Sequence, residues 1–337
     1  NDGLRKSCPD AERAGRQGRF GARLALRAGM RRVKRSSILR IPKRRTDKLL
    51  LRLIRESFRF LSYLPHSLSA RWAEFLFLTP PRQARTRRER AILARGCFRG
   101  VPSAAGRIAT WRWGEGPAVL LVHGWGGHAG RLSRFVAPLT EAGFSVIAFD
   151  APGHRASEGK LCSVPDFVRA VLAVAQDSGD VAGLVGHSLG AAACLLAMRK
   201  GLRVRAAVLL APLSDPERYA GRFASICRMP RPVCESMKER LAARHGVGWE
   251  NLRLAVPASS SPAPLLILHD RRDAKVPLRD GRAIAASWPG ARLVTTRGLG
   301  HHKILRSAEV IGEAVSFLLP SRASVVLPAG EAVEQIA

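Results

Sequence analysis

Cysteine is scarce in this chain of 337 residues, and its six copies are scattered. No two of them are spaced as CxxC, and they form no dense group that could frame a small domain. A zinc site and a disulfide scaffold are therefore not indicated. A reducing cytoplasm is the simplest compartment for such a chain.

Long apolar runs are also absent. Residues 49–78 come closest, but charged side chains interrupt them and Pro65 breaks the middle. A spanning helix needs about 20 largely apolar residues, so this segment does not cross a bilayer. Apolar side chains recur there at helical spacing, at Leu50, Leu53, Ile54, Phe58 and Leu61. The pattern predicts an amphipathic helix that packs on a globular body, with a peripheral contact to the inner membrane as the alternative.

A secretory signal peptide is not expected either. Such a peptide has an apolar core of about 7–15 residues followed by a small-residue cleavage site, and no segment of this chain has that form.

Acidic residues are few: 26 Asp and Glu stand against 56 Lys and Arg, a net charge of +30. Residues 1–100 carry 27 of the basic residues and only 7 of the acidic ones. In residues 1–48 arginines are mixed with Gly, Ser and Ala, which predicts a disordered basic arm. The arm lacks interleaved aromatic residues, so nucleic acid is not the expected partner. We expect residues 49–105 to form a helical extension and residues 321–337 a tail.

Residues 106–320 have a different pattern, in which short apolar runs alternate with helical segments. After a first strand near residue 108, strands are expected at 118–123, 145–150, 181–188, 204–212, 262–273 and 291–302. Helices are expected at 131–142, 164–178, 189–200, 279–287 and 307–319. This alternation predicts an α/β fold with a doubly wound, mostly parallel sheet, whose ligands bind beyond the carboxyl ends of the strands. Residues 213–261 contain no strong strand and predict a helical lid inserted over those ends.

Residues 186–190 read GHSLG, directly after an apolar strand and directly before a helix of small residues. A serine in the G-x-S-x-G pattern lies on a sharp strand-to-helix turn, and the glycines give the chain room to bend. Ser188 is therefore the candidate nucleophile. Its hydroxyl would lie at the helix start, where free N–H groups favour negative charge.

A serine nucleophile needs a base and an orienting carboxylate. We assign the base to His301, which directly follows Gly300 in a loop, in preference to His302, which is expected to begin the next helix. We assign the acid to Asp273 in preference to Asp270, which lies nearer the strand and would shape the turn. The chain order of serine, acid and base is the one expected for this fold.

Residues 123–127 read HGWGG and end an earlier strand. Two backbone N–H groups aimed at the developing oxyanion would stabilise acyl transfer. We assign them to Trp125 and Leu189. As substrate-binding candidates we name four neighbours of these groups, namely His123, Gly124, Gly126 and His187.

The motifs LLVHGWGG, VIAFDAPGH, GHSLGAA, HDRRDAKVP and GLGHHKIL make residues 106–320 resemble the α/β-hydrolase superfamily, in particular bacterial hydrolases of the esterase and lysophospholipase-like type. The resemblance implies a triad of Ser188, Asp273 and His301. One position departs from the family: Arg155 stands where a glycine usually follows His154. A positive φ at Arg155 would strain the backbone.

The expected function is hydrolysis of carboxylic esters or thioesters of small molecules through an acyl-enzyme on Ser188, with no metal or organic cofactor. Resemblance to the dehalogenases and epoxide hydrolases of this fold would imply an aspartate nucleophile. Position 188 is a serine, so these activities are not expected. Two alternatives stay open: an inactive relative that serves as a binding module, and a cofactor-free haloperoxidase-like activity at the same triad.

Overall fold

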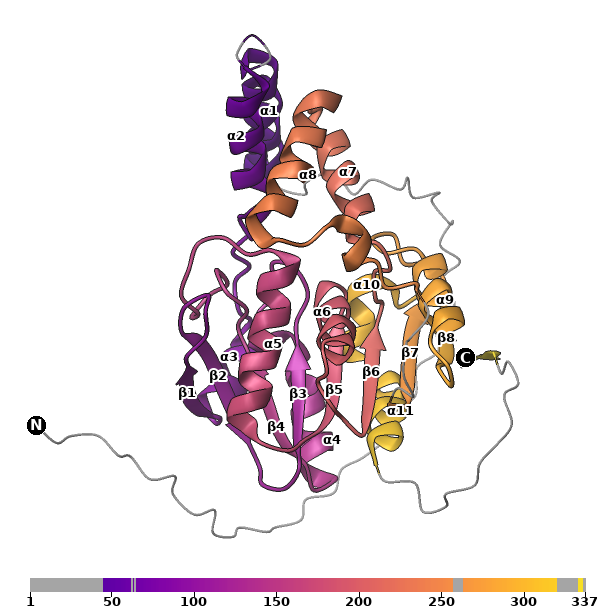
Figure 1. Cartoon of the computed structure of the whole chain (residues 1–337). Helices are drawn as coiled ribbons and strands as arrows, with labels where there is room; N and C mark the ends of the chain where they lie inside the picture. The colour runs from indigo at the N-terminus through magenta and orange to yellow at the C-terminus, as the bar shows by residue number, and fades with distance from the viewer. Residues whose placement is uncertain (1–44, 62, 64, 257–262, 320–332, 336–337) are drawn as a thin grey trace, which may run out of the picture. The chain divides into compact units, whose positions relative to one another are not determined.

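The computed structural model describes residues 45–61, 63, 65–256, 263–319 and 333–335. The expected basic arm, apart from its last four residues, and most of the expected tail lie outside these residues. The described chain folds around one sheet with helices on both faces (Figure 1).

The sheet follows the order β1-β2-β4-β3-β5-β6-β7-β8-β9. Its strands are β1 (Cys97–Val101), β2 (Ile108–Trp113), β3 (Ala118–Val122), β4 (Ser145–Phe149), β5 (Val181–His187), β6 (Ala206–Leu210), β7 (Leu265–Asp270), β8 (Arg292–Thr296) and β9 (Val333–Gln335). β2 runs antiparallel to β1 and β4, and every other pair is parallel. The central strands are buried along their whole length, because helices cover both of their faces. The prediction of a doubly wound, mostly parallel sheet is confirmed.

The sheet begins earlier than the sequence predicts. β1 lies within residues 49–105, which were expected to form a helical extension. It is an edge strand whose first three residues are exposed, so it lacks the apolar run that marks the buried strands.

Helices cover the two faces of the sheet as two layers. One apolar core lies under α5 (Val164–Ser178), α6 (Leu189–Arg199) and α9 (Leu278–Ser287). The opposite core lies under η1 (Ala129–Phe135), α4 (Val136–Glu141), α11 (Ala308–Leu318) and α3 (Arg87–Ala94). The predicted segment 131–142 is thus split into a 3-10 helix and a short α-helix.

A helical insertion separates β6 from β7, as the sequence predicts for 213–261. It contains α7 (Pro216–Cys227), α8 (Arg231–His245) and η2 (Trp249–Leu252), while residues 257–262 lie outside the described residues. The buried Asp280 of α9 fixes its start, because its carboxylate accepts the Ser214 N–H at 3.2 Å and pairs with Arg218 at 2.7 Å. Figure 1 shows α7 and α8 beyond the carboxyl ends of the central strands.

Two helices precede the sheet and pack on this insertion. α1 (Arg45–Leu61) and α2 (His66–Leu78) are separated at Pro65, where the sequence predicts a break. The buried Glu74 of α2 pairs with Arg240 at 2.9 Å and Arg244 at 2.7 Å on α8. Phe58, Ala73 and Met237 share a third apolar core between the two helix pairs.

Candidate active site

Ser188 lies between β5 and α6 with φ 55° and ψ −117°. This backbone conformation is strained for a residue with a Cβ, and it is held by the surrounding structure. The Ser188 N–H donates to the Leu210 carbonyl at 2.9 Å. The turn places the serine at the N-terminus of α6, where the helix dipole favours negative charge.

The two flanking glycines are required by space. A Cβ on Gly186 would lie 2.6 Å from Ala191 Cα, and one on Gly190 would lie 2.3 Å from the His123 carbonyl oxygen. Both contacts are shorter than van der Waals distance and involve backbone atoms, so no side chain could move to relieve them. The G-x-S-x-G pattern therefore reflects close backbone approach on both sides of the serine.

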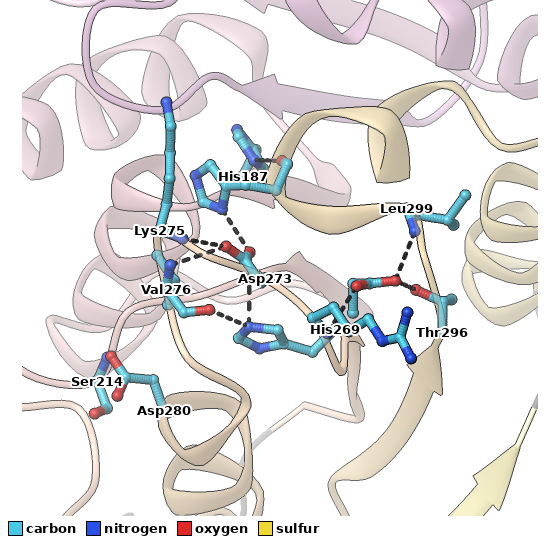
Figure 2. Close-up of polar contacts among 12 residues, drawn as sticks. His187, Ser214, His269, Asp273, Lys275, Val276, Asp280, Thr296 and Leu299 are labelled. Carbon is cyan, nitrogen blue, oxygen red and sulfur yellow. Dashed lines mark hydrogen bonds and ion pairs between the residues drawn. The ribbon is translucent and has the colours of Figure 1, made fainter. Parts of the chain in front are cut away.

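His301 Nδ1 lies 2.7 Å from Asp273 Oδ2, which joins two predicted site residues that follow different strands. Asp273 Oδ1 accepts the N–H groups of Lys275 at 2.7 Å and Val276 at 2.9 Å, contacts that Figure 2 shows around the carboxylate. Burial would raise the pKa of Asp273, but the hydrogen bond from His301 and those from the two amides outweigh it. The net pKa is below the usual value, so the carboxylate stays charged beside His301.

Asp270, the alternative acid, is the last residue of β7, and its carboxylate is occupied by structural hydrogen bonds. Its carboxylate accepts hydrogen bonds from the Arg272 N–H at 2.9 Å, the Thr296 hydroxyl at 3.0 Å and the Leu299 N–H at 2.8 Å. These bonds fix the end of β7 to the loop that leads to His301 (Figure 2).

His301 and His302 both lie in the short helix α10 (Gly300–Lys303). The expectation that His301 would lie in a loop ahead of this helix is therefore wrong, because the helix already begins at Gly300. His302 Nε2 lies 2.8 Å from Lys275 Nζ. Burial, followed by the nearby charge of Lys275, lowers the pKa of His302 to about 4.

His187 contacts His301 through a hydrogen bond to its main chain and through ring packing. Its ring is buried, its Nε2 lies 3.0 Å from the His301 carbonyl oxygen, and the two ring centroids are 4.7 Å apart. Burial, together with the neighbouring His301 and His302, holds the pKa of His187 well below its ordinary value, so the ring is neutral. The substrate-binding role that the sequence suggests for His187 does not fit this position, because the ring is engaged with α10.

His269 is a neighbour of the site that the sequence analysis missed. This fully buried side chain has Nε2 3.0 Å from the Val276 carbonyl oxygen and 3.9 Å from Asp273 Oδ2. It supports the loop that carries Asp273. The available signal was a histidine inside the apolar strand sequence LLILHD.

His123 supports the loop at residues 123–127 from within. It is fully buried, its Nε2 accepts the Ala151 N–H at 3.0 Å, and its Nδ1 therefore donates to the Gly124 carbonyl at 2.7 Å. Because both nitrogens are engaged inside the protein, the predicted substrate-binding role of His123 is wrong. Gly124 lies against the nucleophile, since a Cβ there would be 3.0 Å from Ser188 Cβ.

Gly126 is constrained by packing. It has φ +65°, its N–H donates to His154 Nε2 at 3.1 Å, and a Cβ would lie 2.6 Å from Pro81 Cγ. These contacts are sufficient reason for a glycine at this position, and the substrate-binding role of Gly126 stays a prediction. Trp125 lies between Gly124 and Gly126, and Leu189 is the first residue of α6, where an amide has no intrahelical acceptor.

Arg155 has φ 44°. This φ lies in the left-handed region although the residue is not glycine, so the backbone is strained there, which is the condition that the sequence left open. The neighbouring His154 ring is held between the Pro152 carbonyl oxygen, 2.9 Å from Nδ1, and the Gly126 N–H. The loop therefore keeps its contact with residues 123–127 at the cost of strain at Arg155.

Metal ligands are not grouped in the described part of the chain: no three His, Cys, Asp or Glu side chains there are arranged to hold a metal ion.

The sheet order, the strained serine between β5 and α6, and the helical insertion after β6 define an α/β hydrolase. Two family models match the chain: one described as serine aminopeptidase, S33, over residues 116–254, and one described as TAP-like protein over residues 247–322. The chain belongs to the α/β-hydrolase superfamily and is an esterase-like enzyme.

Known relatives and structures agree with this placement. The pimeloyl-(acyl-carrier protein) methyl ester esterase of Xanthomonas campestris pv. campestris (strain B100) is 28% identical over 244 residues, which cover 60% of this chain and 94% of the relative. The 2-hydroxy-6-oxononadienedioate/2-hydroxy-6-oxononatrienedioate hydrolase of Comamonas testosteroni is 26% identical over 242 residues, which cover 56% of this chain and 82% of the relative. The esterase Pf2001 of Pyrococcus furiosus shares the fold with a TM-score of 0.54 at 18% identity, over 71% of this chain and 98% of that structure.

Proposed function

We propose that this enzyme hydrolyses carboxylic esters through an acyl-enzyme on Ser188, with His301 as the base and Asp273 as the orienting acid. The observation that carries the proposal is the 2.7 Å contact between His301 Nδ1 and Asp273 Oδ2. With Nδ1–H donated to the carboxylate, Nε2 of His301 is the nitrogen left to take a proton.

In the first half-reaction, Ser188 Oγ attacks the ester carbonyl carbon while its proton moves to His301 Nε2. The carbonyl oxygen becomes an oxyanion, which the N–H groups of Trp125 and Leu189 stabilise. The intermediate collapses, the bond to the leaving oxygen breaks, and the imidazolium returns its proton to the departing alcohol. Asp273 stabilises the imidazolium and keeps the ring in its orientation.

In the second half-reaction, water attacks the acyl carbon and gives one proton to His301 Nε2. Collapse releases the carboxylic acid, and the proton returns to Ser188 Oγ. Every proton transfer uses a side chain of the triad, so the reaction requires no metal or organic cofactor.

The relatives support the ester class. One is named a methyl ester esterase, and its chain is matched over almost its full length. An ester is therefore the first substrate class to test, with thioesters beside it.

The test compares Ser188→Ala with Ser225→Ala. Ser225 lies exposed on α7, where its hydroxyl donates to the Gly221 carbonyl one turn back in the same helix, so its loss is a matched control. We expect p-nitrophenyl ester hydrolysis to fall by about 10³-fold or more in Ser188→Ala and to stay unchanged in Ser225→Ala. A fluorophosphonate probe should label the wild type and the control only. A series of acyl chain lengths, presented as esters and as acyl-CoA thioesters, assigns the substrate. Full activity in Ser188→Ala would overturn the proposal.

A further inference from the structure

The helices α1 and α2 carry a second apolar face that points away from the protein. Leu53 is 58% exposed, Phe60 73% and Tyr63 84%, whereas Phe58 on the inner side of α1 is 1% exposed. The outward face consists of the exposed apolar side chains Leu49, Leu50, Leu53, Phe60, Tyr63, Leu68, Trp72 and Phe75. Soluble proteins seldom expose so many large apolar groups together, and such patches mark interaction surfaces.

The opposite side of α1 and α2 already packs against α7 and α8. The outward face is therefore not needed to attach these helices to the rest of the protein. Arg55 Nε donates to the Ile226 carbonyl of α7 at 3.0 Å, and the Ser69 hydroxyl donates to the Leu61 carbonyl at 2.8 Å. The bond of Ser69 joins α2 to α1, whereas the bond of Arg55 and the ion pairs of Glu74 hold the two helices against the insertion.

The exposed side chains of the two helices form one surface. Trp72 Nε1 of α2 donates to the Ser57 hydroxyl of α1 at 3.0 Å, and the Trp72 and Phe75 rings stack with centroids 5.7 Å apart. On α1, residues 49, 53, 57 and 60 recur at helical spacing, which places Ser57 on the same side as Leu53 and Phe60. The hydrogen bond of Trp72 therefore joins the apolar sides of both helices.

Positive charge borders this surface. Lys48 and Arg52 are exposed on α1, one helix turn apart and beside the apolar side, and Arg71 is exposed next to Trp72 on α2. Among the α1 residues whose side chains are described, Glu56 is the acidic one; helical spacing places it on the same side as Leu53 and Phe60, and it lies 3.8 Å from Arg59. An apolar side flanked by basic residues is complementary to an anionic lipid surface, where lysine and arginine meet headgroups and apolar side chains enter the acyl boundary.

We propose that the outward face of α1 and α2 docks the enzyme on an anionic bilayer. The contact is interfacial, since none of the described helices is long and apolar enough to cross a membrane. α2 packs along α8, and the α7–α8 insertion lies beyond the carboxyl ends of the strands that carry the site (Figure 1). Docking through these helices would hold the insertion near the membrane, where apolar esters accumulate.

The test uses the full-length protein and vesicles of phosphatidylcholine, with or without a share of phosphatidylglycerol, at low and high ionic strength. One variant removes apolar groups (Leu53→Ser, Phe60→Ser and Phe75→Ser), and a second reverses charge (Lys48→Glu and Arg52→Glu). Phe98→Ser is the apolar control, since Phe98 is 61% exposed on the distant edge strand β1. Arg279→Glu with Arg282→Glu is the charge control on the exposed side of α9.

We expect the wild type and both controls to sediment with anionic vesicles, and both docking variants to bind at least about tenfold more weakly. Trp72 fluorescence, taken as the difference between wild type and Trp72→Phe, should be quenched by brominated acyl chains. This readout separates apolar insertion from a purely electrostatic attraction of the basic N-terminal region.

Three results would overturn the proposal: no vesicle binding by the wild type, equal binding by the apolar variant, or a dimer that the apolar variant dissociates while lipid binding persists. Hydrolysis of a soluble p-nitrophenyl ester without vesicles should be the same in the docking variants and the wild type. Failure of lipid docking is thereby distinguished from failure of the proposed esterase activity.

Discussion

His301 and Asp273 lie 28 positions apart in the sequence, and their side chains meet at 2.7 Å. Asp273 is held by two backbone N–H groups of its own loop, so its second oxygen is free to orient the imidazole. Asp273→Asn keeps the shape but removes the negative charge and places an amide against Nδ1. We expect kcat for a p-nitrophenyl ester to fall by about 10³–10⁴-fold, with the fold retained by circular dichroism.

Asp270→Asn is the matched comparison for this change. Asp270 at the end of β7 accepts hydrogen bonds from Arg272, Thr296 and Leu299, so its substitution should lower the free energy of unfolding by about 1–3 kcal/mol. Activity per folded molecule should change far less than in Asp273→Asn. The assignment of the acid fails if the two variants lose activity equally.

The sequence predicts the sheet and the proposed triad because their signals are local. Ser188, Asp273 and His301 each follow an apolar strand within a short motif, and a parallel sheet brings the carboxyl ends of such strands together. The supporting contacts depend on distant residues instead. For His123 the sequence predicts a substrate-binding role. Its burial and its hydrogen bonds to Ala151 and Gly124 arise only from the fold, so the sequence does not reveal them. The exposed position of Leu53 could not be read from α1 either, since its helical spacing does not tell which side meets α7 and α8.

Buried histidines should make stability depend on pH. Burial is the main cause that lowers the pKa of His123, His128 and His154, each to about 3. In the unfolded chain the pKa of a histidine is about 6.5, so between these values the unfolded state binds more protons. Stability therefore falls as pH falls below about 6.5, by up to about 1.4 kcal/mol per pH unit for each histidine. Urea unfolding between about pH 7.5 and about pH 5.5, one unit on either side of the unfolded pKa, measures this slope.

His128→Leu should reduce that slope. Neither nitrogen of His128 has a hydrogen-bond partner among the described residues, so this replacement breaks no such bond. We expect the slope to fall by about 1 kcal/mol per pH unit. His66→Leu, at an exposed position on α2, is the control and should leave the slope unchanged. Equal slopes in wild type and His128→Leu would contradict the buried neutral state.

The close backbone approach at Gly190, beside the nucleophile, can be tested by comparison with Gly312, a helical glycine in open space. A Cβ on Gly190 of α6 would meet the Val122 and His123 carbonyl oxygens at 2.4 and 2.3 Å, whereas one on Gly312 of α11 meets nothing within 4 Å. Gly190→Ala should cost at least about 3 kcal/mol of stability or prevent folding. Gly312→Ala should add about 0.5–1 kcal/mol, because alanine is the better helix former. Thermal unfolding of both variants tests the close approach, and a Gly190→Ala protein as stable as the wild type would refute it.

Arg155 tests whether the loop beside the site stores backbone strain. Arg155→Gly and Arg155→Ala remove the same guanidinium, but only glycine relieves the Cβ at φ 44°. Relief of left-handed strain is worth about 1–2 kcal/mol, and the greater freedom of glycine in the unfolded chain offsets part of it. We therefore expect Arg155→Gly to be more stable than Arg155→Ala by about 0.5–1 kcal/mol in urea unfolding. Equal stability would mean that the loop of Arg155→Ala leaves the left-handed conformation, and the hydrogen bond between His154 and Gly126 would then be lost with it.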